Sequence, residues 1–189
     1  MKTATTIPIN ELILGCKLGD RQMQQALYHQ TSAKMFAICL RYAKDRMEAE
    51  DVLQMGFIKI FNHIKEFRGE GVFEGWMKKI MVNTAIESFR KNKRNLTIVA
   101  MEETHELPLI GFDYHSLGVQ DLMKLVESLA DGYRIVFNMY AIEGYSHKEI
   151  AQKLGISEGA SKSQLSRARA ILQKEIIKME GYNYATHTG

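Results

Sequence analysis

Cysteine and proline are both scarce in this sequence of 189 residues, which contains two of each. The cysteines, Cys16 and Cys39, form no CxxC pair, and this excludes a disulfide framework and a cysteine-rich zinc site. The prolines are Pro8 and Pro108. Because proline removes a backbone donor and kinks helix interiors, the long proline-free segments permit long helices.

The sequence also lacks long apolar runs and regularly spaced histidines. No stretch approaches the roughly 18 uninterrupted apolar residues that a bilayer-spanning helix needs, and the N-terminal segment has no apolar block typical of a secretory signal. We therefore expect a cytoplasmic protein with no membrane association. The six histidines show no HExxH or similar spacing, and no Walker-type phosphate loop is present. We accordingly expect no enzymatic activity, no metal and no cofactor.

The net charge is only +3, but it is unevenly distributed along the chain. From Lys78 to Arg94 there are six bases against one acid, and from Arg134 to Lys178 there are eight bases against four acids. Between them, Val99 to Glu127 contains six acids and one base. Two basic blocks separated by an acidic one indicate two surfaces that face a polyanion, joined by a tether. Solvated helix faces would explain either basic block alone, but are less satisfactory for both.

Apolar residues recur at helical spacing and predict an all-α fold. One such stripe consists of Phe73, Trp76, Met77 and Ile80. The segment 95–117 breaks the pattern, because it is acidic, contains Pro108 and is longer than most connections within a compact domain. We therefore predict two small helical domains, 8–94 and 118–180, joined by a flexible acidic linker, 95–117.

The stretch 145–174 predicts a helix-turn-helix. Ser146 and Glu149 have the spacing of a capping box, and Gly155 suits the left-handed conformation that ends a helix. Ser157 can cap a second helix that starts at Glu158. Hydroxyl and basic groups on the outer face of that helix suit base edges and phosphates in the major groove, namely Lys162, Ser163, Ser166 and Arg167. An ordinary amphipathic hairpin is the alternative interpretation.

Upstream of this stretch, a supporting helix is expected to begin near Asp131. Val136, Phe137 and Tyr140 would then pack in the core beneath the hairpin.

The stretch 67–93 combines glycines and aromatic residues with a basic helix. Phe67, Phe73 and Trp76 lie beside a glycine-rich loop, where aromatic rings can stack on unpaired bases, each stack contributing roughly 1–3 kcal/mol. Because Phe73 and Trp76 are also at helical spacing, a place in the core is the alternative. On the preceding helix, Asp51 and Gln54 share a face that is either solvated or docks a basic partner, and their spacing does not decide between the two.

The sequence contains, in order, EAEDVLQMGFIKIFNHIKEFRGEGVFEGWMKKIMVNTAIESFRK, a variable acidic linker, and LADGYRIVFNMYAIEGYSHKEIAQKLGISEGASKSQLSRARAIL. Together these runs resemble a bacterial RNA polymerase sigma factor of the extracytoplasmic-function (ECF) type, group IV of the sigma-70 family. The resemblance implies a sigma-2-like helical bundle that binds core polymerase and the −10 promoter element. It also implies a sigma-4-like helix-turn-helix domain that binds the −35 element, and a role in promoter recognition and DNA melting at transcription initiation.

The resemblance also implies roles for individual residues in the first domain. Asp51 and Gln54 would contact the clamp helices of the largest polymerase subunit, whereas Phe57 would lie in the core. Phe67 and Asn83 would form a pocket for a flipped base of the partly single-stranded −10 element. The residues expected to hold the DNA backbone there are Lys78, Lys79 and Arg90. Gly56, inside the same helix as Asp51, is expected to weaken that helix by about 1 kcal/mol relative to alanine.

In the second domain, the residues that match positions contacting the duplex −35 element are Lys162, Ser163, Ser166 and Arg167. The implied partners are core RNA polymerase and promoter DNA. Members of the group are often held by an anti-sigma factor, and no residue here shows whether one exists. The main alternative is a two-domain helix-turn-helix regulator that binds duplex DNA without polymerase. It would explain 145–174, but not the glycine-aromatic loop joined to a basic helix.

Overall fold

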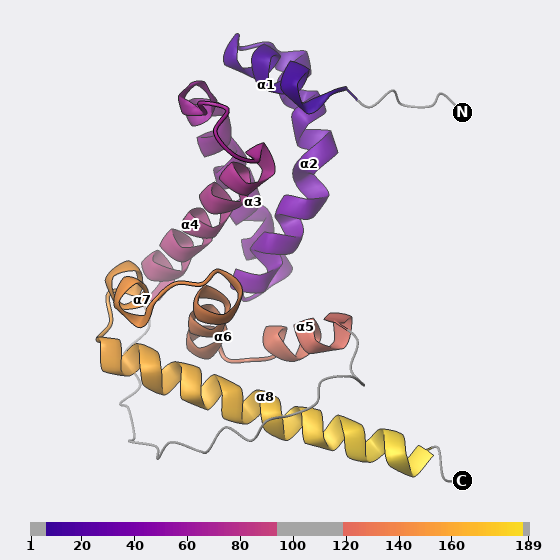
Figure 1. Cartoon of the computed structure of the whole chain (residues 1–189), viewed down its shortest axis with the longest axis vertical. Helices are drawn as coiled ribbons and strands as arrows, with labels where there is room; N and C mark the ends of the chain where they lie inside the picture. Colours follow the sequence, from indigo (N-terminus) through magenta and orange to yellow (C-terminus); the bar gives the residue numbers. More distant parts are fainter. Residues whose placement is uncertain (1–6, 94–118, 187–189) are drawn as a thin grey trace. The chain divides into compact units, whose positions relative to one another are not determined.

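Helices form every regular element in the residues that the computed structural model describes, 7–93 and 119–186 (Figure 1). The chain divides into two compact units, with the boundary between Lys91 and Asn92. The predicted all-α fold with two helical domains is thereby confirmed. The predicted linker, 95–117, lies outside the described residues, so the finer domain boundaries remain predictions.

The first unit contains four α-helices and a short 3₁₀ turn within residues 7–93. They are α1 (Ile9–Lys17), α2 (Arg21–Tyr42), α3 (Arg46–His63), η1 (Ile64–Glu66) and α4 (Phe73–Lys93). Acidic caps fix two of the helix starts. The Asp20 carboxylate accepts from the Gln22 amide at 2.7 Å, and the Asp45 carboxylate accepts from the Glu48 amide at 2.8 Å. Each carboxylate satisfies a backbone donor that has no partner within its own helix.

The core of the first unit lies between α2, α3 and α4. Helix α2 packs against α1 and α3, and α3 lies beside α4 in Figure 1. The apolar stripes meet here, and the side chains buried between the helices include Leu27, Met35, Leu53, Phe57, Ile60, Met77 and Met81. The prediction that Phe57 is a core residue is thus confirmed. At the surface, Lys59 and Glu87 form an ion pair of 2.7 Å between α3 and α4.

Gly56 has a packing role that its helix propensity does not reveal. It is buried in α3, and a Cβ atom added to it would overlap the sulfur atom of Met81 on α4. Met81 is itself fully buried. The expectation that Gly56 merely weakens α3 is therefore incomplete, because the missing side chain leaves the space that the Met81 side chain of α4 occupies.

Gly15 of α1 provides the clearer test of such close packing. A Cβ on Gly15 would lie 2.7 Å from the Cβ of Met23 on α2, an atom that no side-chain rotation can move away. We expect Gly15→Ala to lower the free energy of unfolding by about 1–3 kcal/mol, because overpacking outweighs the gain in helix propensity. The matched control is Gly75→Ala in α4, where nothing lies within 4 Å of the added Cβ.

Urea denaturation of both glycine variants measures the difference. Gly75→Ala is expected to be neutral or to stabilise the fold by up to about 1 kcal/mol. Equal or greater stability of the Gly15→Ala protein would show that α1 and α2 do not cross as closely as the structure has them.

The second unit is built around one long helix. Its elements are α5 (Val119–Glu127), α6 (Asp131–Phe137), the π-helical segment η2 (Asn138–Ile142), α7 (His147–Leu154) and α8 (Glu158–Thr186). Helix α6 begins at Asp131, as predicted, and α8 continues well beyond the stretch 145–174. Helix α8 contacts α5, α6 and α7. A buried cluster joins α5 to α8 and consists of Val126, Leu129, Ala168 and Leu172.

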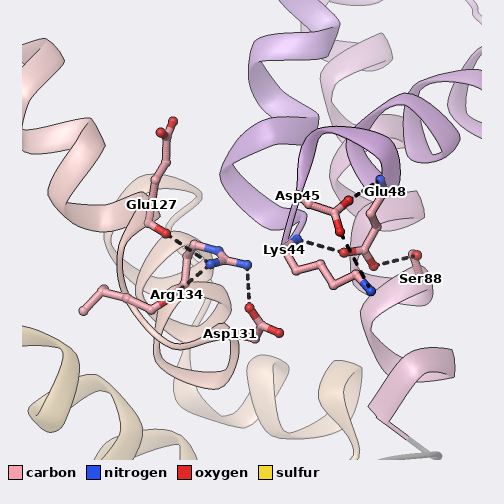
Figure 2. Close-up of polar contacts among 8 residues, drawn as sticks. Lys44, Asp45, Glu48, Ser88, Glu127, Asp131 and Arg134 are labelled. Atoms are coloured by element: carbon pink, nitrogen blue, oxygen red, sulfur yellow. Dashed lines mark hydrogen bonds and ion pairs between the residues drawn. The ribbon is translucent and has the colours of Figure 1, made fainter.

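Arg134 connects α5 to α6 from a buried position (Figure 2). Its guanidinium donates to the backbone carbonyls of Glu127 at 3.2 Å and Leu129 at 3.0 Å, and it pairs with the Asp131 carboxylate at 2.7 Å. The last carbonyls of a helix have no partner within that helix. Arg134 therefore caps α5 and fixes the tight turn into α6.

Tyr140 corrects one prediction for this unit. Val136 is fully buried, as expected, but Tyr140 is 36% exposed and lies outside the core. It belongs to the π-helical segment η2, whose wider turn shifts side chains out of the register of α6. The Tyr140 ring instead stacks on the His147 imidazole, with 4.6 Å between ring centroids.

Candidate nucleic-acid interface

The predicted capping chemistry fixes both ends of α7 and the start of α8. The Ser146 hydroxyl accepts from the Glu149 amide at 3.3 Å, and the Glu149 carboxylate accepts from the Ser146 amide at 2.8 Å. Hydrogen bonds from the Ser146 side chain and amide hold the pKa of Glu149 below its usual value. Gly155 has a φ of 67° and ends α7. The Ser157 hydroxyl then accepts from the Ala160 amide at 3.0 Å at the start of α8.

Small and apolar residues hold the two helices together. Ile150 and Leu154 of α7 and Leu165 of α8 are buried, and Ser161 is completely buried where the helices meet. The Ser161 hydroxyl lies 2.9 Å from Nδ1 of His147 and so ties the first turns of both helices. The predicted helix-turn-helix is therefore confirmed, and it presents the opposite side of α8 outward.

The four candidate −35 residues lie on the outward side of the first turns of α8. Ser163 and Ser166 are three residues apart, share a face and are partly exposed. Lys162 flanks this face, and its exposed ion pair with Glu158 at 3.1 Å contributes little to stability. Arg167, on the other flank, is partly buried and donates to the Tyr133 hydroxyl of α6 at 3.4 Å. Arg167 therefore also has a packing contact that the sequence did not indicate.

On α4, helical geometry separates the basic residues that the sequence grouped together. Lys79, Asn83 and Arg90 are spaced four and seven residues apart and share one face. Lys79 and Arg90 are exposed, whereas Asn83 is partly buried. Trp76 lies on the same face, three residues before Lys79. Lys78 is rotated by about 100° from Lys79, so its side chain starts from a different face of α4.

The aromatic cluster lies at the end of η1 and the start of α4. Phe67 is only 7% exposed, and its ring centroid lies 5.0 Å from that of Phe73 and 5.6 Å from that of Trp76. Phe73 is also buried, whereas Trp76 is partly exposed and stacks on Phe73 at 5.5 Å. An incoming base would therefore meet Trp76 first, and the role predicted for Phe67 would require the loop to open. That role stays a prediction.

Asp51 and Gln54 are exposed on α3, and Asp51 lies on the side of the helix away from the buried Leu53 and Phe57. A shallow groove between α2 and α3 reaches Gln54, and its lining includes Tyr28, Phe36, Arg46, Glu50 and Leu53. The exposed face around Asp51 also carries apolar side chains that sequence reasoning missed: Met47, Met55 and Ile58, 72%, 49% and 51% exposed. The sequence does contain a pattern that could have identified these three residues, because they form a second apolar stripe at helical spacing, opposite the core stripe of α3.

Within the described residues, no group of three or more histidine, cysteine, aspartate or glutamate side chains is arranged to hold a metal ion. None of the helices described combines the length and the apolar character required to cross a bilayer.

His147 makes the stability of the second unit depend on pH. Burial lowers its pKa below the ordinary 6.5, and the nearby charges of Lys162 and Arg169 act in the same direction against the opposing charge of Glu158. The unfolded chain therefore binds more protons at this site than the folded chain, so the free energy of unfolding falls as the pH drops through and below 6.5.

A His147→Gln variant removes this titration. We expect its melting temperature to fall less between pH 7.5 and pH 5.5 than that of the unchanged chain, as followed by circular dichroism at about these two pH values. Parallel pH profiles for the two proteins would contradict the assigned direction of the pKa shift.

Two family models match the chain, one in each unit. Sigma-70 region 2 matches residues 27–95, which include the exposed face of α3 and all of α4. Sigma-70 region 4 matches residues 120–172, which include the helix-turn-helix. The chain belongs to the sigma-70 family. The resemblance inferred from the sequence is thus confirmed, and the four candidate residues of α8 lie inside region 4.

Individual relatives agree with the assignment to the sigma-70 family. The chain is 28% identical over 158 residues to the ECF RNA polymerase sigma factor SigE of Mycolicibacterium smegmatis, covering 80% of this chain and 61% of that protein. It is 27% identical over 184 residues to the ECF RNA polymerase sigma factor SigW of Bacillus subtilis, covering 89% and 96%. The chain thus spans less than two thirds of SigE, but nearly all of SigW. These relatives identify the chain as an ECF-type member of the sigma-70 family.

Among solved structures, the sigma factor RpoE of Bartonella quintana in complex with the anti-sigma factor NepR is 22% identical, with a TM-score of 0.44, and the match covers 79% of this chain and 94% of RpoE.

Proposed function

We propose that this sigma-70 family chain binds core RNA polymerase, recognises the −35 and −10 elements of promoters and promotes DNA melting at transcription initiation. The observation that carries the proposal is the presence of regions 2 and 4 in one chain, each with an outward helix face that suits DNA. The relatives SigE and SigW are named RNA polymerase sigma factors, which supports the polymerase as the partner.

The face of α8 suits a duplex. A recognition helix that enters the major groove contacts base edges with residues near its N-terminus, and the partly exposed Ser163 and Ser166 lie there. Hydroxyl groups can donate to or accept from base edges, and the flanking Lys162 and Arg167 suit guanine or phosphate. Phosphate contacts position the helix, while base contacts select the sequence. We assign this face to the −35 element.

The face of α4 suits DNA that has lost its pairing. Trp76 offers a partly exposed ring, Asn83 an amide that can pair with a base edge, and Lys79 and Arg90 two exposed cations for the backbone. Taking a base out of the stack costs a few kcal/mol, which stacking and hydrogen bonding in a pocket can recover. We assign this face to the −10 element and to the capture of the melted strand.

The exposed face of α3 suits a protein partner rather than DNA. Asp51 is acidic and would be repelled by phosphate, whereas Met55 and Ile58 can bury apolar area against another protein. We assign this face to core polymerase. The chain would then make and break no covalent bond, and the polymerase would supply the catalysis.

Run-off transcription with purified core polymerase tests the function. Fragments of the genome that encodes the chain serve as templates, with and without the purified chain. We expect discrete transcripts only when the chain is added, and their start sites identify the promoters. If duplex fragments are bound and shifted by the chain alone while no transcript appears with core enzyme, the two-domain regulator is the better description.

A further inference from the structure

Lys17 connects the end of α1 to a loop fifty residues further along the chain. Its ammonium donates to the backbone carbonyl of Phe67 at 2.7 Å and lies 6.0 Å from the centroid of the Phe67 ring. Phe67 ends η1 and opens the loop 67–72 that leads to α4. Lys17 lies outside the residues matched by the family models, which begin at 27.

The loop has little else to hold it. Gly69 and Gly71 have φ values of +79° and +80°, and nothing lies within 4 Å of a Cβ built on either, so the loop tip projects into open space. Val72, at the far end of the loop, is 77% exposed. Phe67 ties the loop to the rest of the unit, because its ring packs in the aromatic cluster and its carbonyl accepts from Lys17.

The bond between Lys17 and Phe67 has the properties of an anchor. It is charge-assisted and partly buried, and such bonds are shorter and stronger than bonds between neutral groups. Lys17 is also the last residue of α1, where the helix dipole favours a cation. The ammonium thus fixes the Phe67 carbonyl and, through it, the direction in which the loop leaves η1.

We propose that Lys17 is a positioning residue for the reading of unpaired promoter DNA. By anchoring Phe67, it holds the loop 67–72 and the aromatic cluster in register with the face of α4 that carries Trp76 and Asn83. This inference rests on the proposed function of that face. Lys17 acts through the Phe67 backbone and makes no DNA contact of its own.

The free chain offers a direct probe of the anchor, because Trp76 is the only tryptophan in the sequence. Lys17→Met keeps the aliphatic stem but removes the donor, and Lys17→Arg restores a cationic donor. We expect acrylamide to quench Trp76 emission more strongly in Lys17→Met, and Lys17→Arg to resemble the unchanged chain. Lys65→Met, at an exposed lysine of η1, is the matched control and should leave quenching unchanged. Unchanged quenching in a folded Lys17→Met protein overturns the anchor.

The holoenzyme then tests the link to DNA, at a promoter identified by run-off transcription. We expect Lys17→Met and Asn83→Ala each to lower permanganate reactivity of unpaired thymines about tenfold, with closed-complex binding retained. The salt dependence of closed binding should also stay unchanged in Lys17→Met, whereas loss of a direct phosphate contact would reduce its slope by about one.

Each outcome has its own meaning. Normal melting by Lys17→Met, with Asn83→Ala defective, overturns the positioning role but keeps the function of the α4 face. A reduced salt slope in Lys17→Met also overturns it, in favour of direct phosphate binding by Lys17. Normal melting by both variants contradicts the assignment of the α4 face itself, and the quenching result then still decides whether the anchor exists.

Discussion

Replacing Lys162 and Arg167 together by alanine is expected to lower transcription from a promoter with an intact −35 element by roughly a hundredfold. The two cations flank the outward face of α8, and each good contact to a base edge or phosphate contributes about 1–3 kcal/mol of discrimination or binding. Binding to core polymerase should be unchanged, because neither residue lies on α3. The measurement is the ratio of transcripts from intact and scrambled −35 elements, alongside the affinity for core enzyme.

Arg167 needs a control, because its guanidinium donates to Tyr133 at 3.4 Å. Tyr133→Phe removes that bond and leaves the outward face of α8 intact. We expect this variant to retain −35 selectivity and lose at most about 1 kcal/mol of stability. If the double variant loses core binding while its selectivity persists, the two domains have been assigned the wrong way round.

Reversing charge on α3 is expected to have an effect of similar size on assembly. Asp51→Arg combined with Gln54→Ala should raise the dissociation constant for core polymerase about a hundredfold, because an unfavourable charge across an interface costs several kcal/mol. Both side chains are exposed, so the fold should tolerate the changes. Titration of labelled core enzyme with the full chain measures the effect.

Glu11→Arg is the matched control for Asp51→Arg. It makes the same charge change at an exposed acid of α1, away from α3 in the sequence. Unchanged affinity in this control and loss in the α3 variant would locate the docking face on α3. Equal losses in both would indicate a general electrostatic effect, and no loss in either would remove Asp51 and Gln54 from the interface.

The helix-turn-helix could be predicted almost completely from the sequence, because its signals are local. Ser146, Glu149, Gly155 and Ser157 each act on backbone groups within a few residues, so their spacing is sufficient to place the two helices and the turn. The all-α fold followed in the same way from apolar spacing. The core position of Phe57 on α3 was anticipated by the family resemblance, and the buried ring agrees with it.

The contacts that the sequence did not reveal join residues far apart in the chain. Lys17 reaches Phe67 and Arg167 reaches Tyr133, across 50 and 34 positions. No local pattern encodes such contacts, since they arise from how whole helices pack. Tyr140 was misplaced for a different reason, because the π-helical turn that carries it shifts the register expected of a regular α-helix.

The candidate DNA-binding residues of α4 show what a charge count taken from the sequence does not reveal. Composition grouped Lys78 with Lys79 as basic neighbours, yet adjacent residues of a helix point about 100° apart. Of these two lysines, only Lys79 shares its face with Asn83 and Arg90. A charge count therefore locates a basic helix, while helical geometry decides which of its cations can face one ligand.

Gel filtration of the purified chain mixed with purified core polymerase, followed by promoter binding, is the decisive measurement. We predict that the chain and the polymerase co-elute as a one-to-one complex and that this complex alone opens promoter DNA. A chain that elutes apart from the polymerase at micromolar concentration, yet binds duplex promoter by itself, would contradict the proposal that its two helical units act as parts of a transcription-initiating enzyme.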